Sequence, residues 1–349
     1  MEAGFEVLAI DAFADVDTQQ QSQETLQVAV TGGQFDAQAI LNILRKTKLD
    51  EYVGFCYGAG FEASAVTLDE VGRLIPVLGN NAETVTNSKH PRSFFALCDT
   101  LGMAYPPTAY EYPVDMEGWL VKSIGASGGG HIRLLKPGFA RQDNAYYQKV
   151  QTGKPVSCLF LASGNKVQVI GYNEQWCSPE QDYPYRYGGA VSCTELSDDC
   201  KKTIRVFVEA IALQLDLRGI NSMDFIVDGK NVYALELNPR LSATLDLYRG
   251  VNLFEAHVKV SLGEFKSLAG EASLARAHQI IYARQATRIA NKMHWPDWVS
   301  DIPQSGSLIE VGMPICTIVA EAPSAVAAKQ LIADRLLNIN KKLDGFEQV

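Results

Sequence analysis

The sequence predicts a mixed fold, with an α/β domain first and an antiparallel α+β region after it. Short apolar runs alternate with helical patterns over residues 1–86, which is typical of a small parallel sheet. Strand patterns joined by short turns then dominate residues 87–265, which indicates antiparallel hairpins. At 349 residues, the chain is also long enough to form two or three domains rather than a single core.

The N-terminal domain is expected to hold three buried strands and two helices. Glycines follow two of these strands, at Gly32 and Gly33 and again at Gly58 and Gly60. In open parallel sheets, ligands usually bind at such turns between a strand and a helix. The expected strands are residues 5–10, 26–30 and 52–56, and the expected helices are residues 37–47 and 68–79.

The middle region is expected to open with a helix that starts at Asn87 or Ser88 and runs to about Leu101. Gly102 would close this helix, because glycine favours the left-handed position after a helix end. The remaining expected elements are strands over 118–136 around a glycine loop, strands at 156–161 and 166–171, an irregular tyrosine-rich stretch at 182–188, a helix at about 201–216, a hairpin at 219–240 and, in a third unit over 266–349, strands and turns at 278–320 with a helix from 322 to about 342.

The composition excludes several classes of function. The net charge is −9 and no stripe of lysine and arginine occurs, so a nucleic-acid partner is not expected. No apolar run reaches the roughly 18 residues of a membrane helix. The acidic N-terminus lacks a secretory signal pattern, so a cytoplasmic protein is expected. The seven cysteines form no Cys-x-x-Cys pair, which favours buried free thiols over a disulfide or metal framework.

The most informative segment is the hairpin over residues 219–240, whose turn contains the strong signal Asp-Gly. Asp224 lies on its first strand, and Glu236 and Asn238 lie on its second. Asp224 and Glu236 are equally distant in sequence from Lys230, so an odd-length loop is expected to set the two carboxylates opposite each other.

Side chains along a strand alternate between its two faces. Glu236 and Asn238 should therefore share a face, while Leu235 and Leu237 should point into a core. Carboxylate and amide oxygens grouped in this way suit a hard cation that carries phosphate. The alternative is a set of solvated side chains on an exposed strand face. The strongly apolar opposite face favours the metal–nucleotide site.

Lys122 is a second candidate, because it ends the apolar strand WLVK just before a glycine-rich loop. This loop, GASGGG over residues 125–130, would let successive backbone N–H groups approach a phosphate. It matches neither the P-loop nor the Rossmann glycine pattern, and by itself it could be a flexible hairpin end. Together with Lys122 and the downstream carboxylates, phosphate binding is the favoured interpretation.

Three more side chains are candidates for phosphate contacts. Lys89 is expected at the start of a helix, where the helix dipole disfavours a cation unless an anionic ligand lies close to it. His131 follows the glycines and could contact phosphate or only occupy its strand. Arg240 leaves the second hairpin strand, where a phosphate or acyl-phosphate contact is favoured over a surface position. The sequence contains no recognisable Ser/His/Asp or Cys/His nucleophile arrangement.

In this order, these parts resemble the ATP-grasp superfamily of carboxylate–amine ligases. The resemblance covers most of the chain and rests on the N-terminal α/β domain, the two lysines, the loop GASGGGHI, the segment YYQKVQTGKPVSCLF and the hairpin end LELNPR. It implies an ATP-grasp fold, with a Rossmann-like pre-ATP-grasp domain at the N-terminus and a small β-rich and helical segment at the C-terminus. The implied domains are residues 1–86, 87–265 and 266–349.

The resemblance also implies two cofactors, ATP and Mg²⁺ or Mn²⁺, and a role for each candidate. Many members carry glutamate where this chain has Gln148. The residues implied to contact ATP are Lys89, Lys122, Ser127, Gly128, Gly129, Gly130, His131, Gln148, Lys149 and Val150, the last three through the backbone at adenine; those implied to hold the metal are Asp224, Glu236 and Asn238; and those implied to be catalytic are Arg240 and Lys122.

More narrowly, the segments IDAFADVDT, YGAGFE, LGNNAETV and WPDWVSDIPQSGSLIEVGMPICTIVA resemble a carboligase subgroup related to biotin carboxylase. That subgroup occurs with one-carbon pathway proteins (methylofuran, methanofuran, tetrahydromethanopterin) of methylotrophs, and it is similar to the glutamate ligases of methylofuran and methanofuran biosynthesis. The resemblance implies ADP-forming ligation of a small carboxylate, with glutamate as one substrate, to a small amine. A homo-oligomer is also implied, because relatives are often dimers or tetramers. The alternatives are a bicarbonate-activating enzyme and a nucleotide-binding protein without turnover.

Overall fold

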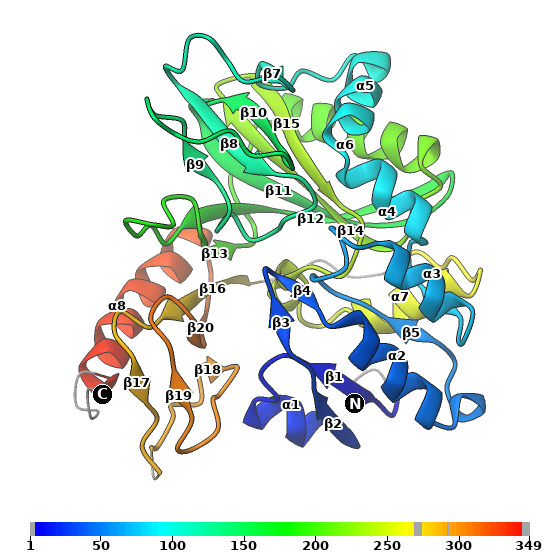
Figure 1. The fold of residues 1–349 in the computed structure, drawn as a ribbon, viewed down its shortest axis with the longest axis vertical. Helices are drawn as coiled ribbons and strands as arrows, with labels where there is room; N and C mark the ends of the chain where they lie inside the picture. Colours follow the sequence, from blue (N-terminus) through cyan, green and yellow to red (C-terminus); the bar gives the residue numbers. More distant parts are fainter. Residues whose placement is uncertain (1–3, 269–273, 292, 344–349) are drawn as a thin grey trace.

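The computed structural model describes residues 4–268, 274–291 and 293–343, and an eight-stranded sheet forms its centre (Figure 1). All neighbouring strands of this sheet are antiparallel. The C-terminal strands therefore extend the same sheet as the hairpin that carries Asp224 and Glu236 (the acidic hairpin). The strands, in sheet order, are β15 (Asn231–Asn238), β14 (Arg218–Asp228), β11 (Lys154–Ser163), β12 (Lys166–Cys177), β13 (Tyr187–Val191), β16 (Ala275–Tyr282), β20 (Pro314–Ala322) and β18 (Val299–Ser300).

Helices cover both faces of this sheet and separate its cores. Helix α6 (Asp198–Gln214) buries Ile204, Val208 and Ile211 against β11, β14 and β15. It begins at Asp198 because the Ser197 side chain accepts from the N–H of Cys200, an N-cap that satisfies a free donor of the first turn. The other elements of this part are η2 (Ala243–Leu247), α7 (Leu253–Ser261), β17 (Thr287–Arg288), β19 (Leu308–Ile309) and α8 (Ala325–Leu343).

The N-terminal part contains the expected parallel pairing, but not as one sheet. β1 pairs with β2, and β5 pairs with β6, in two separate parallel sheets. The expected helix over 68–79 ends earlier, at Gly72, and β6 follows it. Pro76 disfavours helical geometry in the residue before it, so the chain becomes extended at this point. The elements are β1 (Leu8–Asp11), α1 (Val16–Gln21), β2 (Glu24–Gln27), β3 (Val30–Thr31), β4 (Gln34–Phe35), α2 (Ala37–Lys46), η1 (Leu49–Glu51), β5 (Phe55–Cys56), α3 (Val66–Gly72) and β6 (Val77–Leu78).

A four-stranded sheet forms the top of the molecule in Figure 1 and faces the acidic hairpin. It contains β7 (Thr108–Ala109), β10 (Ala145–Lys149), β8 (Trp119–Ser123) and β9 (Arg133–Leu134), in that order. Two helices precede it, α4 (Ala82–Lys89) and α5 (Pro91–Leu101).

The expectation that Lys89 opens a helix is wrong. Asn81 caps α4 through the N–H of Thr84, and Lys89 is the last residue of that helix. Pro91 then begins α5, a position where the missing proline N–H costs nothing. The helix dipole therefore favours the Lys89 ammonium instead of opposing it. The prediction for Gly102 is confirmed, because it adopts the left-handed C-cap with φ of 68°.

The acidic hairpin has the expected pairing for a different reason. Its turn has two residues, between Asp228 and Asn231, rather than an odd number. A bulge at Leu235 then shifts the register so that Asp224 pairs directly with Glu236. The same bulge removes Leu235 from the alternation, so only Leu237 is fully buried in the core.

Two further sequence expectations have defined outcomes. Cys177 and Cys193 are exposed rather than buried, while all seven thiols are free. In the described residues, no helix is both long and apolar enough to span a membrane. The division into three domains stays a prediction, although buried residues of α3 and α4 pack with the N-terminal core and those of α5 pack with the sheet core.

His257 generates a testable prediction, because it joins three elements while buried. Its Nδ1 accepts from the N–H of Ile220 at 2.9 Å, and its Nε2 donates to the carbonyl of Leu78 at 3.0 Å. Burial lowers the pKa of His257 to about 4, against the opposing effect of the Leu78 hydrogen bond. Its ordinary pKa in an unfolded chain is about 6.5.

The unfolded state therefore binds more protons between pH 6.5 and 4, and the unfolding free energy should fall as pH falls through this window. In His257→Leu, chemical denaturation should show a pH slope shallower than wild type by up to about 1.4 kcal/mol per pH unit. The exposed His294 provides the control, and His294→Gln should retain the wild-type slope. Identical slopes in wild type and His257→Leu would contradict the prediction.

Candidate active site

The structure brings the three predicted metal residues together on one face of the hairpin. Asp224 and Glu236 are direct cross-strand partners. Asn238 donates from Nδ2 to Oδ2 of Asp224 at 3.0 Å. Lys89 reaches the same face from the end of α4, and its Nζ lies 3.0 Å from both Oε2 of Glu236 and Oδ1 of Asn238. The group thus contains two carboxylates, one amide and one ammonium.

The two carboxylates differ in charge. Burial and the nearby Glu236 carboxylate raise the pKa of Asp224 to about 7. Burial acts in the same direction on Glu236, but the Lys89 and Lys122 ammonium groups outweigh it and hold the pKa of Glu236 at about 2. At neutral pH, Glu236 is therefore fully charged and Asp224 only partly ionised, and additional positive charge nearby would favour the ionised form of Asp224.

Lys122 approaches this face from strand β8. Its Nζ donates to Oε1 of Gln148 at 2.8 Å and lies 5.8 Å from the ring centre of Tyr146. Burial lowers the pKa of Lys122, whereas Glu236 and Asp224 oppose that shift. The Gln148 side chain also donates to Thr108 at 3.1 Å. The Gln148 side chain thus links Lys122 to Thr108 and helps to hold Lys122 in place.

The glycine-rich loop closes over the same region. Within the described residues, the N–H groups of Ser127, Gly128 and Gly129 donate to no other group. Gly128 and Gly129 have φ of 70° and 69°, a conformation that favours glycine. His131 lines a small cavity with Lys89 and Glu236, and its buried Nδ1 has no hydrogen-bond partner among the described residues. Unpaired donors of this kind are suited to an anion.

The irregular tyrosine-rich stretch fixes the loop from outside. Tyr187 donates its N–H to the carbonyl of Gly128 at 2.9 Å. A Cβ at Gly129 would lie 2.1 Å from the carbonyl oxygen of Tyr185, so only glycine fits there. Arg186 stacks on Tyr282, with its guanidinium 3.7 Å from the ring centre. This stretch therefore packs as a support for the loop.

The expected adenine-binding segment already uses some of its backbone groups within the protein. The N–H of Lys149 donates to the carbonyl of Pro107, and that of Val150 donates to the carbonyl of Gly118, each at 2.8 Å. Their donors are therefore already used. The N–H of Gln151, just beyond β10, has no partner in the described chain and is left for a ligand. Sequence patterns carry no information about which of these amides the neighbouring strands take.

Arg240 has a partner that the sequence analysis did not identify. Its Nε donates to Oε1 of Glu62 at 2.8 Å, and the Glu62 side chain is only 2% exposed. The other oxygen of Glu62 accepts from the N–H groups of Gly60 and Phe61. The sequence did contain a signal for Glu62, because this residue follows the glycines of a strand-to-helix turn, where ligands and functional groups often lie. Arg218 instead pairs with Asp216 at the surface, outside this group.

Sequence comparison identifies the central part of the chain. Residues 93–244 match the family described as the ATP-grasp domain. An uncharacterized protein of Methanocaldococcus jannaschii is 22% identical over 264 residues, 70% of this chain and 64% of that protein. The carbamoyl phosphate synthase large chain of Caldanaerobacter subterraneus subsp. tengcongensis is 25% identical over 254 residues, 64% of this chain. The chain spans only 23% of that synthase, and less than two thirds of either relative.

Solved structures share the arrangement of the whole chain. The biotin carboxylase domain of Hydrogenobacter thermophilus 2-oxoglutarate carboxylase, in complex with MgADP, ADP and bicarbonate, matches with a TM-score of 0.72 at 15% identity, over 100% of this chain and 86% of that one. Biotin carboxylase from Campylobacter jejuni matches with a TM-score of 0.71 at 14% identity, over 94% and 84% of the two chains. ATP-grasp enzymes use ATP and Mg²⁺. The chain has the ATP-grasp fold, and its residues 93–244 match the ATP-grasp domain family.

Proposed function

We propose that this protein is an ATP-dependent, ADP-forming ligase that joins a small carboxylate to an amine. The observation that carries the proposal is a shared site: Asp224, Glu236, Asn238 and Lys89 lie together, and Glu236 and Lys89 line a small cavity with Gly125 and Ala126 of the glycine-rich loop and with His131 after it. These are the groups that a magnesium-bound triphosphate requires, since they pair anionic ligands for the metal with positive and N–H groups for the phosphates.

In this proposal the triphosphate lies between the loop and the hairpin. The N–H groups of Ser127, Gly128 and Gly129 would contact its oxygens, with His131 beside them. Lys122 would neutralise phosphate charge from strand β8. Adenine would occupy the end of β10, beside the segment 148–150 and the N–H of Gln151. The loop would also exclude water, which otherwise hydrolyses an acyl phosphate.

The metal residues fit a hard divalent cation by their chemistry. Asp224, Glu236 and Asn238 supply carboxylate and amide oxygens, the ligands that magnesium and manganese prefer. Magnesium would supply charge neutralisation of the phosphates, and its charge would favour the ionised form of Asp224. Lys89 now occupies the position between Glu236 and Asn238. Its flexible side chain would turn from these oxygens to the phosphates once both are bound.

The chemistry would proceed in two displacements. A carboxylate oxygen attacks the γ-phosphorus of ATP, the bond to the bridging oxygen breaks, and ADP leaves. The amine nitrogen then attacks the carbonyl carbon of the acyl phosphate, and inorganic phosphate leaves while the amine loses a proton. Positioning and fixed charge supply most of the acceleration for such transfers. Arg240 is the candidate to hold the acyl phosphate, because Glu62 fixes its guanidinium beside Asn238.

We propose that the enzyme adds glutamate, its carboxylate substrate, to a precursor of the one-carbon carrier methylofuran. This finer assignment is supported by the segments that resemble the methylofuran and methanofuran ligase subgroup. The test is mass spectrometry of products formed from ATP, glutamate and a panel of small amines.

A bicarbonate-activating reaction is the second candidate, favoured by the fold shared with biotin carboxylases. The two reactions differ in what they require. Release of ADP that depends on an amine and not on bicarbonate supports the ligase. Dependence on bicarbonate would support the carboxylase-type reaction. Tight ATP binding without ADP under any mixture would indicate a nucleotide-binding protein without turnover.

The metal assignment gives a direct prediction. Glu236→Gln should abolish ATP turnover, by at least about 100-fold, because removing one buried charge-assisted contact at a transferring phosphoryl group costs roughly 3 kcal/mol or more. ADP release measures the effect, and circular dichroism checks the fold. Glu255→Gln is the control: this glutamate is half-buried on α7, where it pairs with Lys259, and the variant should retain full activity. A fully active Glu236→Gln would reject the assignment.

The loop assignment gives a second prediction, through a matched pair of glycines. Gly129→Ala and Gly128→Ala incur the same strain from positive φ, but only position 129 has a backbone atom within 4 Å of the new Cβ. We expect Gly129→Ala to weaken ATP binding at least about tenfold more than Gly128→Ala, since a shifted loop costs more than about 1.4 kcal/mol in contacts. Isothermal titration calorimetry provides the measurement. Equal affinities for the two variants would contradict a loop closed by Tyr185.

Glu62 should act as a positioning residue for Arg240. In Glu62→Gln, we expect kcat to fall about 10- to 100-fold with the ATP affinity unchanged, because Glu62 contacts Arg240 and its own loop but none of the groups proposed to contact ATP. Glu111→Gln removes an exposed ion pair with Arg141 and should change neither quantity. If the ATP affinity falls as much as kcat in Glu62→Gln, the positioning role is wrong.

A further inference from the structure

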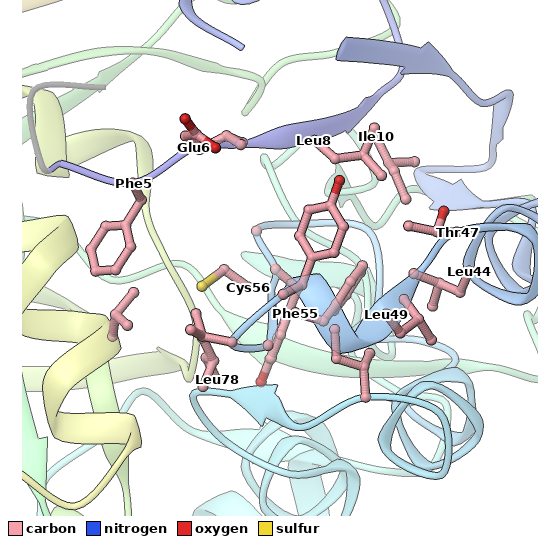
Figure 2. Close-up of a pocket in the computed structure, with 18 of the residues that line it drawn as sticks. Phe5, Glu6, Leu8, Ile10, Leu44, Thr47, Leu49, Phe55, Cys56 and Leu78 are labelled. Atoms are coloured by element: carbon pink, nitrogen blue, oxygen red, sulfur yellow. The ribbon is translucent and has the colours of Figure 1, made fainter. Parts of the chain in front are cut away.

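A cavity lies in the N-terminal part, and its described lining contains no residue of the glycine-rich loop. It measures about 640 Å³, within the range of small-molecule sites. Figure 2 shows β1 along its upper edge, β5 at its centre and side chains from both strands directed into it. Phe5 closes one end and Leu44 with Leu49 closes the other.

The cavity exists because the parallel strands form two sheets instead of one. Among the residues that the structure describes, β1 pairs only with β2, and β5 pairs only with β6. The carbonyls of Val7 and Asp11 face β2, since they accept from Gln23 and Val28. The intervening backbone groups of Leu8 and Ile10 therefore face the opposite, open edge. Both residues line the cavity, so hydrogen-bonding groups of the open edge are available beside apolar walls.

The open edge of β5 has the same property. The N–H of Phe55 donates to the carbonyl of Pro76 on the β6 side, so the backbone of Cys56 faces away from β6. The Cys56 side chain also points into the cavity (Figure 2). Burial raises the pKa of its thiol to about 12, which makes the thiol an apolar wall group rather than a nucleophile.

The charged and aromatic lining defines the class of ligand. All charged side chains among the described lining residues are carboxylates: Glu6, Asp11 and Glu51. Glu6 has no ion pair in the described chain, and Asp11 uses only one oxygen, Oδ1, to accept from the N–H groups of Phe13 and Ala14. Glu51 has a distant, exposed partner in Lys48 at 3.8 Å. The aromatic lining residues are Phe5, Phe35, Tyr52, Phe55, Tyr57, Phe61 and Phe254.

We propose that this cavity binds a small aromatic amine in its protonated form. The ring would pack against the aromatic and aliphatic walls, and the ammonium would lie at the rim beside one of its carboxylates. Aromatic faces and carboxylates both attract an ammonium group, whereas an anionic ligand would meet three negative charges and no lysine or arginine. The open strand edges would accept its N–H groups.

The cavity has a physical connection to the active site. Tyr57 and Phe61 form part of its wall, and Glu62, the partner of Arg240, is the next residue. The Tyr57 hydroxyl also donates to the carbonyl of Pro239 at 3.2 Å, directly before Arg240. A ligand in the cavity thus contacts the segment that positions Arg240. The proposal concerns binding in the cavity and does not depend on the proposed ligase reaction.

The test uses phenethylamine as the probe, with the full chain and without ATP. Isothermal titration calorimetry should show binding of phenethylamine, at least tenfold tighter than binding of 3-phenylpropionate, which has a similar ring and the opposite charge. Raising the salt concentration should weaken the amine binding, because the rim carboxylates are exposed to solvent.

Two variants locate the binding. Cys56→Phe fills the cavity with a ring and should weaken phenethylamine binding at least tenfold. Glu6→Gln combined with Glu51→Gln removes two exposed rim charges without touching the core, and should weaken it at least threefold. Glu24→Gln, an exposed acid on β2 outside the cavity, is the matched control and should bind as wild type does. ATP affinity measured on the same samples should stay unchanged, which separates this proposal from the nucleotide site.

Equal affinity for the amine and the acid would overturn the proposal, and so would undiminished amine binding in both the filled and the charge-removed variants. No detectable phenethylamine binding at millimolar concentration would overturn it too. If Cys56→Phe fails to fold, the rim variant and its Glu24→Gln control decide the question.

Discussion

The site depends on charge compensation across the boundary between the hairpin and the elements that precede it. Buried carboxylates are costly unless a positive group pairs with them. The Lys89 ammonium supplies that group for the Glu236 carboxylate. In the second contact, the Glu62 carboxylate pairs with the Arg240 guanidinium and holds it in place. Both contacts join residues more than a hundred positions apart in sequence. They hold the hairpin against α4 and against the turn after β5.

The bulge at Leu235 is the local feature that makes this pairing possible. A two-residue turn alone would place Glu236 out of register with Asp224, and side chains on the wrong face would reach the core. Inserting one unpaired residue restores the register at the end of the hairpin where the carboxylates lie. Bulges next to functional groups are a common way to aim a side chain. The freed Leu235 lines the small cavity beside Lys89 and Glu236.

The glycine-rich loop is held in place on one side by Tyr185 and Tyr187, while some of its N–H groups stay free for a ligand. Free N–H groups at Ser127, Gly128 and Gly129 are available to an anion, yet Tyr187 and Tyr185 hold the outer side of the loop. A ligand would therefore meet donors whose positions are largely set before it binds, and less ordering entropy opposes its binding. The cost of that arrangement is a strict requirement for glycine at position 129, where any Cβ would overlap a backbone carbonyl.

Local patterns in the sequence determined the hairpin, the glycine loop and the cap at Gly102, because alternation, turn residues and left-handed positions are properties of neighbouring residues. The direct pairing of Asp224 with Glu236 depends instead on the bulge at Leu235, not on the expected odd-length loop. The superfamily could be inferred from the order of those parts. Tertiary structure decided what neighbouring residues cannot encode: that Lys89 ends a helix and meets Glu236, that Glu62 holds Arg240, that Lys149 and Val150 use their N–H groups on other strands, and that the parallel strands leave a cavity between two sheets. Each of these is a contact between distant segments, so its outcome depends on packing and on competition for hydrogen bonds across the whole chain.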